Sequence, residues 1–197
     1  MIEWLESIDR EIVLAVNGMH SPFLDELMWL ISGRLTWVPL YLYLFFIVLK
    51  KIGSKKAVVF LVFVLLSVAF SDLISVHLFK NVFLRYRPSH NLLIMDQLHF
   101  YQEAPGKFYR GGEYGFISSH AANIFAIITC VSLLFGEKKK KLKYILIAIG
   151  LIICLSRIYL GVHYFSDVLV GALVGSLVAF LLFQAGFKKI ITFNAQE

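Results

Sequence analysis

Long runs of apolar residues, separated by short polar segments, are the main pattern of this chain. A helix needs about 20 predominantly apolar residues to cross the hydrocarbon core of a bilayer. Five runs meet that requirement if polar inward faces are allowed, at residues 27–49, 57–79, 119–135, 144–159 and 165–187. The pattern predicts an all-α integral membrane protein with about five transmembrane helices, and neither a repeat nor a linker divides residues 1–197 into more than one domain.

Two segments outside these runs have patterns of their own. Residues 1–17 place apolar side chains at helical spacing with charged side chains opposite, which predicts an amphipathic helix lying on the membrane surface. Its apolar face holds Trp4, Leu5, Ile8, Ile12 and Val16, and its charged face holds Glu3, Glu6, Asp9 and Arg10. The longest polar segment, residues 85–115, predicts an outer loop that either recognises a lipid headgroup or covers the bundle as a solvated cap.

The composition agrees with a membrane protein and excludes an ordinary soluble domain. Of the 197 residues, 59% are hydrophobic and only 16% are charged, and the mean hydropathy is +0.76. Soluble domains carry about 25% charged residues. The two cysteines, Cys130 and Cys154, fall inside apolar runs, which favours small buried side chains over a disulfide or a metal site.

The placement of lysines predicts the orientation. The net charge is +6, and lysines gather within residues 50–56, 138–143 and 188–189. With five spans these three regions lie on one side, which the positive-inside rule identifies as cytoplasmic. The lysines are therefore orientation signals and indicate no nucleic acid partner. The amino terminus, the polar loop and the turn around Gly161 then face outward.

The same alternation of sides brings polar side chains from three separate segments to the outer face. They are Lys80, Arg87, Ser118, His120, Arg157, His163 and Asp167. Three of them are fixed cations without a comparable cluster of carboxylates, so an anionic ligand is expected. Arginine pairs with two phosphate oxygens at once and lysine acts as a point charge, which favours phosphate.

The serine and histidine positions refine this prediction. Ser118 begins the third run, where a helix amino terminus binds anions, although a plain helix cap is the alternative. His163 and Asp167 are four residues apart and share one helical face, so the carboxylate can fix the imidazole tautomer. A buried structural pair, or a metal site with His120, is the alternative, but three neighbouring cations would repel a metal ion.

These residues resemble the three signature motifs of the type 2 phosphatidic acid phosphatase (PAP2) superfamily. The family pattern is a lysine, six residues and Arg-Pro; then Pro-Ser-Gly-His; then Ser-Arg, five residues, His, three residues and Asp. This chain has Lys80 through Arg87-Pro88, then Ile117-Ser118-Ser119-His120, then Ser156-Arg157 with His163 and Asp167. Ile117 and Ser119 replace the usual proline and glycine, and neither change removes a reacting group.

The resemblance implies a mechanism without a metal or another cofactor. His163 would attack phosphorus with Asp167 orienting it, and His120 would protonate the leaving oxygen and then activate water. The phosphate oxygens would be held by Lys80, Arg87, Ser118, the amide of Ser119, and Arg157.

The expected substrate is a lipid phosphate within the bilayer, processed at the outer, periplasmic face of a bacterial inner membrane. Undecaprenyl diphosphate is the first expectation. Lipid A, with a 1- or 4'-phosphate, is the next, followed by phosphatidylglycerol phosphate and phosphatidic acid. A lipid-to-lipid phosphotransferase and a lipid transporter are the alternatives from other classes, and the sequence predicts no oligomeric state.

Overall fold

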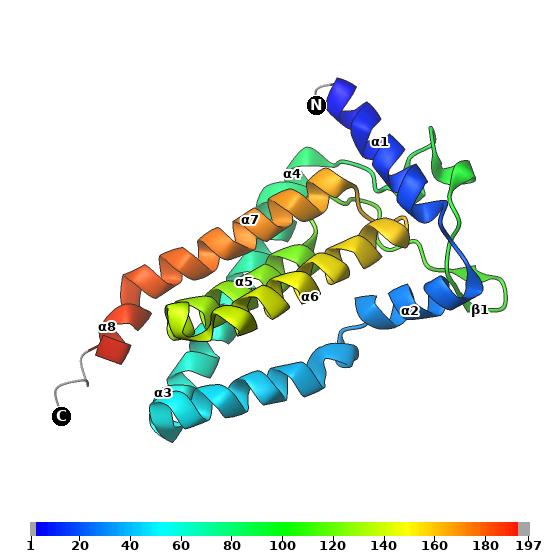
Figure 1. Ribbon diagram of the computed structural model, residues 1–197. Helices are drawn as coiled ribbons and strands as arrows, with labels where there is room; N and C mark the ends of the chain where they lie inside the picture. The colour runs from blue at the N-terminus through cyan, green and yellow to red at the C-terminus, as the bar shows by residue number, and fades with distance from the viewer. Residues whose placement is uncertain (1–2, 193–197) are drawn as a thin grey trace.

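The computed structural model describes residues 3–192, which form a bundle of long helices with an irregular polar cap at one end (Figure 1). The long elements are α1 (Glu3–Asn17), α2 (Pro22–Ser32), α3 (Val38–Ile74), α5 (Ser119–Phe135), α6 (Lys140–Tyr159) and α7 (Phe165–Leu182). Short helical elements are η1 (Leu35–Trp37), η2 (Ser75–Lys80), α4 (Asn81–Phe83), η3 (Pro88–His90), η4 (Met95–Gln97), η5 (Gly136–Lys139), η6 (Phe183–Phe187) and α8 (Lys188–Thr192). Two short strands, β1 (Gln102–Ala104) and β2 (Lys107–Phe108), pair antiparallel within the cap.

Three helical stretches among the described residues are long and apolar enough to cross a membrane: Leu35–Phe83, Ser119–Tyr159 and Phe165–Ile190. The first is interrupted at Gly53, whose φ of 75° and ψ of 169° are not helical. The second is interrupted at Gly136, whose φ is 54°. Glycine tolerates positive φ because it has no Cβ, so the chain reverses at both positions (Figure 1). The helical, membrane-embedded architecture is confirmed.

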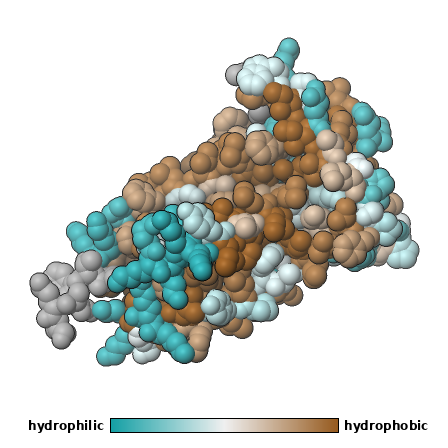
Figure 2. All heavy atoms as spheres, in the orientation of Figure 1, coloured by the Kyte–Doolittle hydropathy of each residue, from teal (hydrophilic) through white to brown (hydrophobic). Residues whose placement is uncertain are grey.

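The core and the outer surface of the bundle are both apolar. A buried cluster fills the space between α3, α5, α6 and α7, with Phe63 stacked on Phe187 at a centroid distance of 4.6 Å. Large side chains such as Leu61, Leu151 and Leu173 face outward, and Figure 2 shows apolar residues around the middle of the molecule with polar residues at its ends. An exposed apolar surface of this extent is suited to lipid contact. Both cysteines are free and buried, as expected.

Helices α5 and α7 approach closely because α7 has glycine where they meet. A Cβ at Gly175 would lie 1.9 Å from the carbonyl oxygen of Ala122, and one at Gly171 would lie 2.6 Å from that of Ser118. The Ser118 N–H also donates to the carbonyl oxygen of Asp167 at 2.9 Å. The amino end of α5 is thus fixed against the first turns of α7.

The lysine clusters gather at one end of the bundle. The Lys51 Nζ donates to the carbonyl oxygen of Leu134 at 2.8 Å, which brings the Gly53 turn beside the end of α5. Helix α8, which carries Lys188 and Lys189, lies at the same end (Figures 1 and 2). The cap lies at the other end.

The predicted span 27–49 begins later than expected. Helix α2 ends at Ser32, and the next helical residues start at Leu35. Thr36 Oγ1 donates to the carbonyl of Leu30 at 2.5 Å and Trp37 Nε1 donates to that of Ile31 at 2.8 Å, which satisfies acceptors left by the break. The mean hydropathy of residues 27–49 stays high across Gly33-Arg34, but the helical backbone is broken at these two residues.

The amino-terminal helix forms as predicted over the described residues, while Met1 and Ile2 lie outside them. Its orientation differs, because Asp9, expected on the exposed charged face, is buried together with Val13 and Asn17. Asp9 is buried because Arg85 pairs with it from 76 residues away, and such a partner leaves no local trace in the sequence. Trp4 and Ile8, on the expected apolar face, are exposed on the protein surface, where they are free to contact a membrane.

Candidate active site

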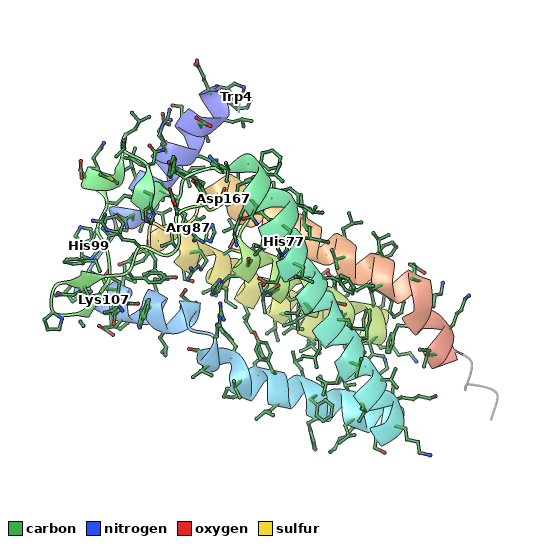
Figure 3. The ribbon with its side chains drawn as sticks, turned by 180° about the vertical axis from the view of Figure 1, so that it is seen from behind. Trp4, His77, Arg87, His99, Lys107 and Asp167 are labelled. Atoms are coloured by element: carbon green, nitrogen blue, oxygen red, sulfur yellow. The ribbon has the colours of Figure 1, made fainter. Side chains whose placement is uncertain are left out.

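The motif residues meet where the capped end of the bundle brings α5, α6, α7 and the outer loop together. Figure 3 shows Arg87 and Asp167 beside each other at this end, with His99 and Lys107 farther out in the loop. The loop is held down from several sides. Asn17 Nδ2 donates to the carbonyl of His99 at 2.8 Å, and Tyr101 stacks on Trp29 at 4.5 Å.

His163 lies in the turn between α6 and α7, where Gly161 has a φ of 67°. Its Nδ1 is 3.4 Å from Asp167 Oδ2, and its Nε2 is 2.9 Å from Arg87 Nη1. A guanidinium only donates, so Nε2 must accept and the ring proton must sit on Nδ1, facing the carboxylate. The pair thus has the tautomer that leaves a lone pair on Nε2.

Asp167 is fully buried and divides its two oxygens among different partners. Oδ2 accepts the backbone N–H of Tyr164 at 2.9 Å as well as the His163 ring, while Oδ1 accepts from Arg85 Nη1 at 2.8 Å. Gly115 passes close by, since a Cβ there would lie 3.1 Å from Oδ2 and 3.0 Å from Arg87 Cγ. A side chain at this position would require Arg87 or Asp167 to shift by a few tenths of an ångström.

Arg87 follows the end of the first membrane-spanning stretch. The helix stops at Phe83, and Leu84 takes a left-handed φ of 47°. The Arg87 Nε donates to the carbonyl of Tyr114 at 3.1 Å and its Nη1 to that of Val162 at 2.9 Å. Burial, and then the cation of Arg157, lower the pKa of Arg87 to about 10, so it remains charged at neutral pH.

The middle motif contacts the first one through a serine. Lys80 Nζ donates to Ser119 Oγ at 2.6 Å, and Ser75 Oγ shares a hydrogen bond with the same atom. Ser119 therefore fixes the ammonium of Lys80. The Ser118 Oγ accepts the N–H of Ala121 at 3.4 Å and caps α5, so the cap expected as an alternative is present.

Arg157 and His120 face a cavity of about 370 Å³ that Arg34 and Tyr109 also line. Arg157 Nη2 donates to the hydroxyl of Tyr109 at 2.7 Å and its Nη1 to Ser32 Oγ, whereas its buried Nε has no partner among the described residues. A buried donor without a partner is unfavourable, so a hydrogen bond to Arg157 Nε would stabilise the site.

A second cavity, of about 230 Å³, meets the first at Ser32, Gly33, Arg34 and His120. Its walls are mostly apolar, and they are formed by Ile31, Trp37, Tyr41, Val68, Ile124, Ile127 and Ile153 together with Asp72, Ser119 and Asn123. An apolar cavity and a polar cavity therefore converge on His120, which suits an amphiphile with a charged headgroup.

The charges around His163 decide its protonation. Burial, and then the cations Arg87, Arg157 and Lys80, hold the pKa of His163 well below its usual range. The imidazole is therefore neutral at neutral pH, as a nucleophile or base must be. Within residues 3–192, no three His, Cys, Asp or Glu side chains lie close enough to share a metal ion.

The structure brings the predicted residues together in three linked groups: Arg87 with His163 and Asp167, Lys80 with Ser119 beside the Ser118 cap, and His120 with Arg157. Sequence reasoning missed the parts played by Asp9, Ser32, Arg34, Arg85 and Tyr109. For Ser32 and Arg34 the sequence held a signal, because Gly33 and Arg34 interrupt the apolar run 27–49. Arg85 stands inside the first motif, but its two partners could not be read from spacing.

Residues 56–191 match the PAP2 superfamily. The lipid A 4'-phosphatase of Porphyromonas gingivalis is 35% identical over 93% of this chain and 75% of its own length. The lipid A 4'-phosphatase of Bacteroides thetaiotaomicron is 34% identical over 95% of this chain and 81% of its own length.

Two solved structures share the fold. The transmembrane PAP2 type phosphatidylglycerolphosphate phosphatase of Bacillus subtilis has a TM-score of 0.68 at 24% identity, over 95% of this chain and 88% of that one. Aquifex aeolicus LpxE has a TM-score of 0.60 at 21% identity, over 88% of this chain and 93% of that one.

Proposed function

The chain belongs to the PAP2 superfamily and is a lipid phosphatase, and from that premise we propose that it removes a phosphate group from lipid A. The observation that carries this substrate is the similarity to two lipid A 4'-phosphatases over 93% and 95% of the chain. That range includes α2 and the outer loop, which line the cavities. Similarity to the phosphatidylglycerophosphatase B of Bacillus subtilis extends over only 40% of the chain.

This proposal changes the order of substrates expected from the sequence. Undecaprenyl diphosphate came first there, but the comparisons give it no support and favour the second expectation. The motifs bind only the terminal phosphoryl group and therefore do not separate the two lipids. The cavities at His120 support an acylated substrate with a polar head, and similarity along the chain supports lipid A.

In the proposed reaction the lone pair of His163 Nε2 attacks phosphorus while the bond from phosphorus to the lipid oxygen breaks. His120 gives its proton to that oxygen, which leaves as a hydroxyl group. Water then attacks the phosphohistidine and His120 takes its proton. The phosphorus–nitrogen bond breaks, inorganic phosphate leaves, and His163 is restored.

The cations would supply the electrostatic part of the catalysis. Charge spreads over the equatorial oxygens in phosphoryl transfer, and Lys80, Arg87, Arg157 and the amino end of α5 at Ser118 and Ser119 surround the place for them. Arg87 now donates to the same Nε2 that would attack, so its guanidinium must turn to a phosphoryl oxygen when substrate binds. A metal ion has no task left in this scheme.

The proposed topology has five membrane spans, with the two longer stretches each folded back at a glycine. The lysine-rich end would lie in the cytoplasm according to the positive-inside rule. The site would then face the periplasmic side of the inner membrane, within reach of a lipid in the outer leaflet.

A substrate panel tests the proposal. The purified protein in detergent should release phosphate from lipid A faster than from undecaprenyl diphosphate, phosphatidylglycerol phosphate or phosphatidic acid. His163→Gln serves as the inactive control. A clear preference for any of the other three lipids would contradict the substrate.

Two additions separate the remaining mechanisms. EDTA should leave phosphate release intact and vanadate should stop it, because vanadate mimics five-coordinate phosphorus. Complete loss in EDTA would overturn the scheme without a metal. Phosphate that appeared on an added acceptor lipid instead of in water would identify a phosphotransferase, and binding without turnover would identify a transporter.

A further inference from the structure

Asp9 and Arg85 form a buried chain of ion pairs that ends on Asp167, and the proposed reaction uses neither of them. Arg85 Nη2 donates to Asp9 Oδ2 at 2.8 Å, and its Nη1 donates to Asp167 Oδ1 at 2.8 Å. The side chains of Arg85, Asp9 and Asp167 are 9%, 5% and 0% exposed. Charge-assisted hydrogen bonds are strong and directional in such surroundings.

Asp9 also holds the first turn of α7. Its Oδ1 accepts the backbone N–H of Ser166 at 3.0 Å, and its Oδ2 accepts the Ser166 hydroxyl. Arg85 Nη1 donates to the same hydroxyl at 2.7 Å. A carboxylate at the amino end of a helix is favoured by the helix dipole. Helix α1 thus fixes the first turn of α7, which carries Asp167. Arg85 contacts one oxygen of Asp167, and His163 contacts the other.

The two oxygens of Asp167 show why this matters. Oδ2 faces His163 and the N–H of Tyr164, and Oδ1 has Arg85. The guanidinium of Arg85 itself lies over the Tyr164 ring at 4.2 Å. The carboxylate plane is therefore held on both edges, and loss of Arg85 would leave it held at Oδ2 alone, where it can turn about that edge.

We propose that Asp9 and Arg85 are positioning residues of the phosphatase site, which act through Asp167 to hold His163 in line with phosphorus. Helix α1 is thereby a necessary part of the site and more than a surface anchor. The inference rests on the proposed function, because it takes His163 as the nucleophile that Asp167 orients. If the two residues only dock α1 onto the bundle, they affect folding and leave turnover per folded molecule unchanged.

The test measures kcat and KM on lipid A for Asp9→Asn, Arg85→Met and the double variant of the full chain. Each maximal rate is divided by the concentration of sites that bind vanadate at saturation, so that kcat refers to folded sites only. Asp9→Asn should lower kcat about tenfold and Arg85→Met about 100-fold with KM unchanged, because a misplacement of about 1 Å can cost about 100-fold. Arg85→Lys should recover part of the loss, since it keeps one cation.

The double variant and a matched control complete the design. The double variant should be no slower than Arg85→Met alone, because residues that act through one partner are not additive. Glu11→Gln removes the same charge from an exposed position of α1 and should match the wild type.

Each other outcome has a distinct meaning. If the wild type is active and Asp9→Asn and Arg85→Met have the same kcat per site as the wild type, the positioning role is overturned and the proposed function stands. Losses that multiply in the double variant would show two independent roles and would overturn it as well. A wild type that hydrolyses no lipid phosphate would overturn the proposed function, and the inference with it.

Discussion

The charge state of His163 follows from what surrounds its ring. The imidazole is buried, and three cations face it without a carboxylate nearer than Asp167 on the Nδ1 side. The same surroundings that keep the ring neutral for attack make its protonation costly for the folded protein. Function and stability are therefore linked at this one residue.

A pH dependence of stability follows. The pKa of His163 is lower in the folded protein than in the unfolded chain, where it is about 6.5. The unfolded chain therefore takes up the extra proton as the pH falls below about 6.5, and the folded protein loses stability progressively from this group as the pH falls further. Thermal unfolding in detergent from pH 7.5 to 5 should show a smaller loss for His163→Gln.

The wild-type protein, unfolded in the same detergent and buffers, is the reference for that measurement. Equal slopes for wild type and His163→Gln would contradict a neutral His163.

Motif spacing predicts that the motif side chains lie near one another, although His163 lies in the turn before α7 and not on a helical face. His163 and Asp167 meet as expected, and so do Arg87 and His163 across the motifs. Spacing could not reveal that Asp167 needs Arg85 and that Arg85 needs Asp9. Those contacts depend on how distant elements pack.

At the element scale, the contact of α5 with α7 helps to form the site, since α5 carries Ser119 and His120 and α7 carries Asp167. Apolar runs predicted α5 with both ends correct and α7 with its beginning correct. They failed at residues 27–49, where the interruption at Gly33 and Arg34 turns α2 aside to become part of the cap. Apolar runs predict where helices form, whereas residues such as Gly33 and Arg34 determine where a helix ends.

Gly175→Ala tests the role of the α5–α7 contact. The added Cβ would lie 1.9 Å from the Ala122 carbonyl oxygen, so the helices must separate. We expect a loss of about 1–3 kcal/mol of stability, as for other overpacked sites, and a lower rate because Ser118 and His120 move away from Asp167. Thermal unfolding and phosphate release measure the two effects.

Gly186→Ala is the matched control, because nothing lies within 4 Å of its Cβ position. It should leave both quantities near the wild-type values. A Gly175→Ala variant that is as stable and active as this control would show that the close approach is dispensable.

At the scale of the whole molecule, one end of the bundle is rich in lysine and the other end carries the motif residues. Lysines gather where the chain turns at Gly53, at Gly136 and after α7. The motif residues Arg87 and Asp167 lie at the opposite end, beneath the cap (Figure 3). The charge pattern predicted this separation because each connection alternates sides. The way the outer loop covers the site was left open by the sequence and depends on its contacts with α1 and α2.

The orientation is testable by cysteine labelling in spheroplasts with a maleimide that does not cross membranes. Lys107→Cys in the outer loop should be labelled from outside, and Lys139→Cys should be labelled only after lysis. The parent chain is the blank, because Cys130 and Cys154 are buried. The reverse pattern would place the site in the cytoplasm.

The central claim is that His163 carries the phosphoryl group during turnover. Its most direct test is rapid quenching of the protein with lipid A labelled in the phosphate, followed by peptide mapping under alkaline conditions, where phosphohistidine survives. Label is expected on the peptide that contains His163, and none is expected in His163→Gln. Label on a different residue, or turnover by His163→Gln at the wild-type rate, would contradict it.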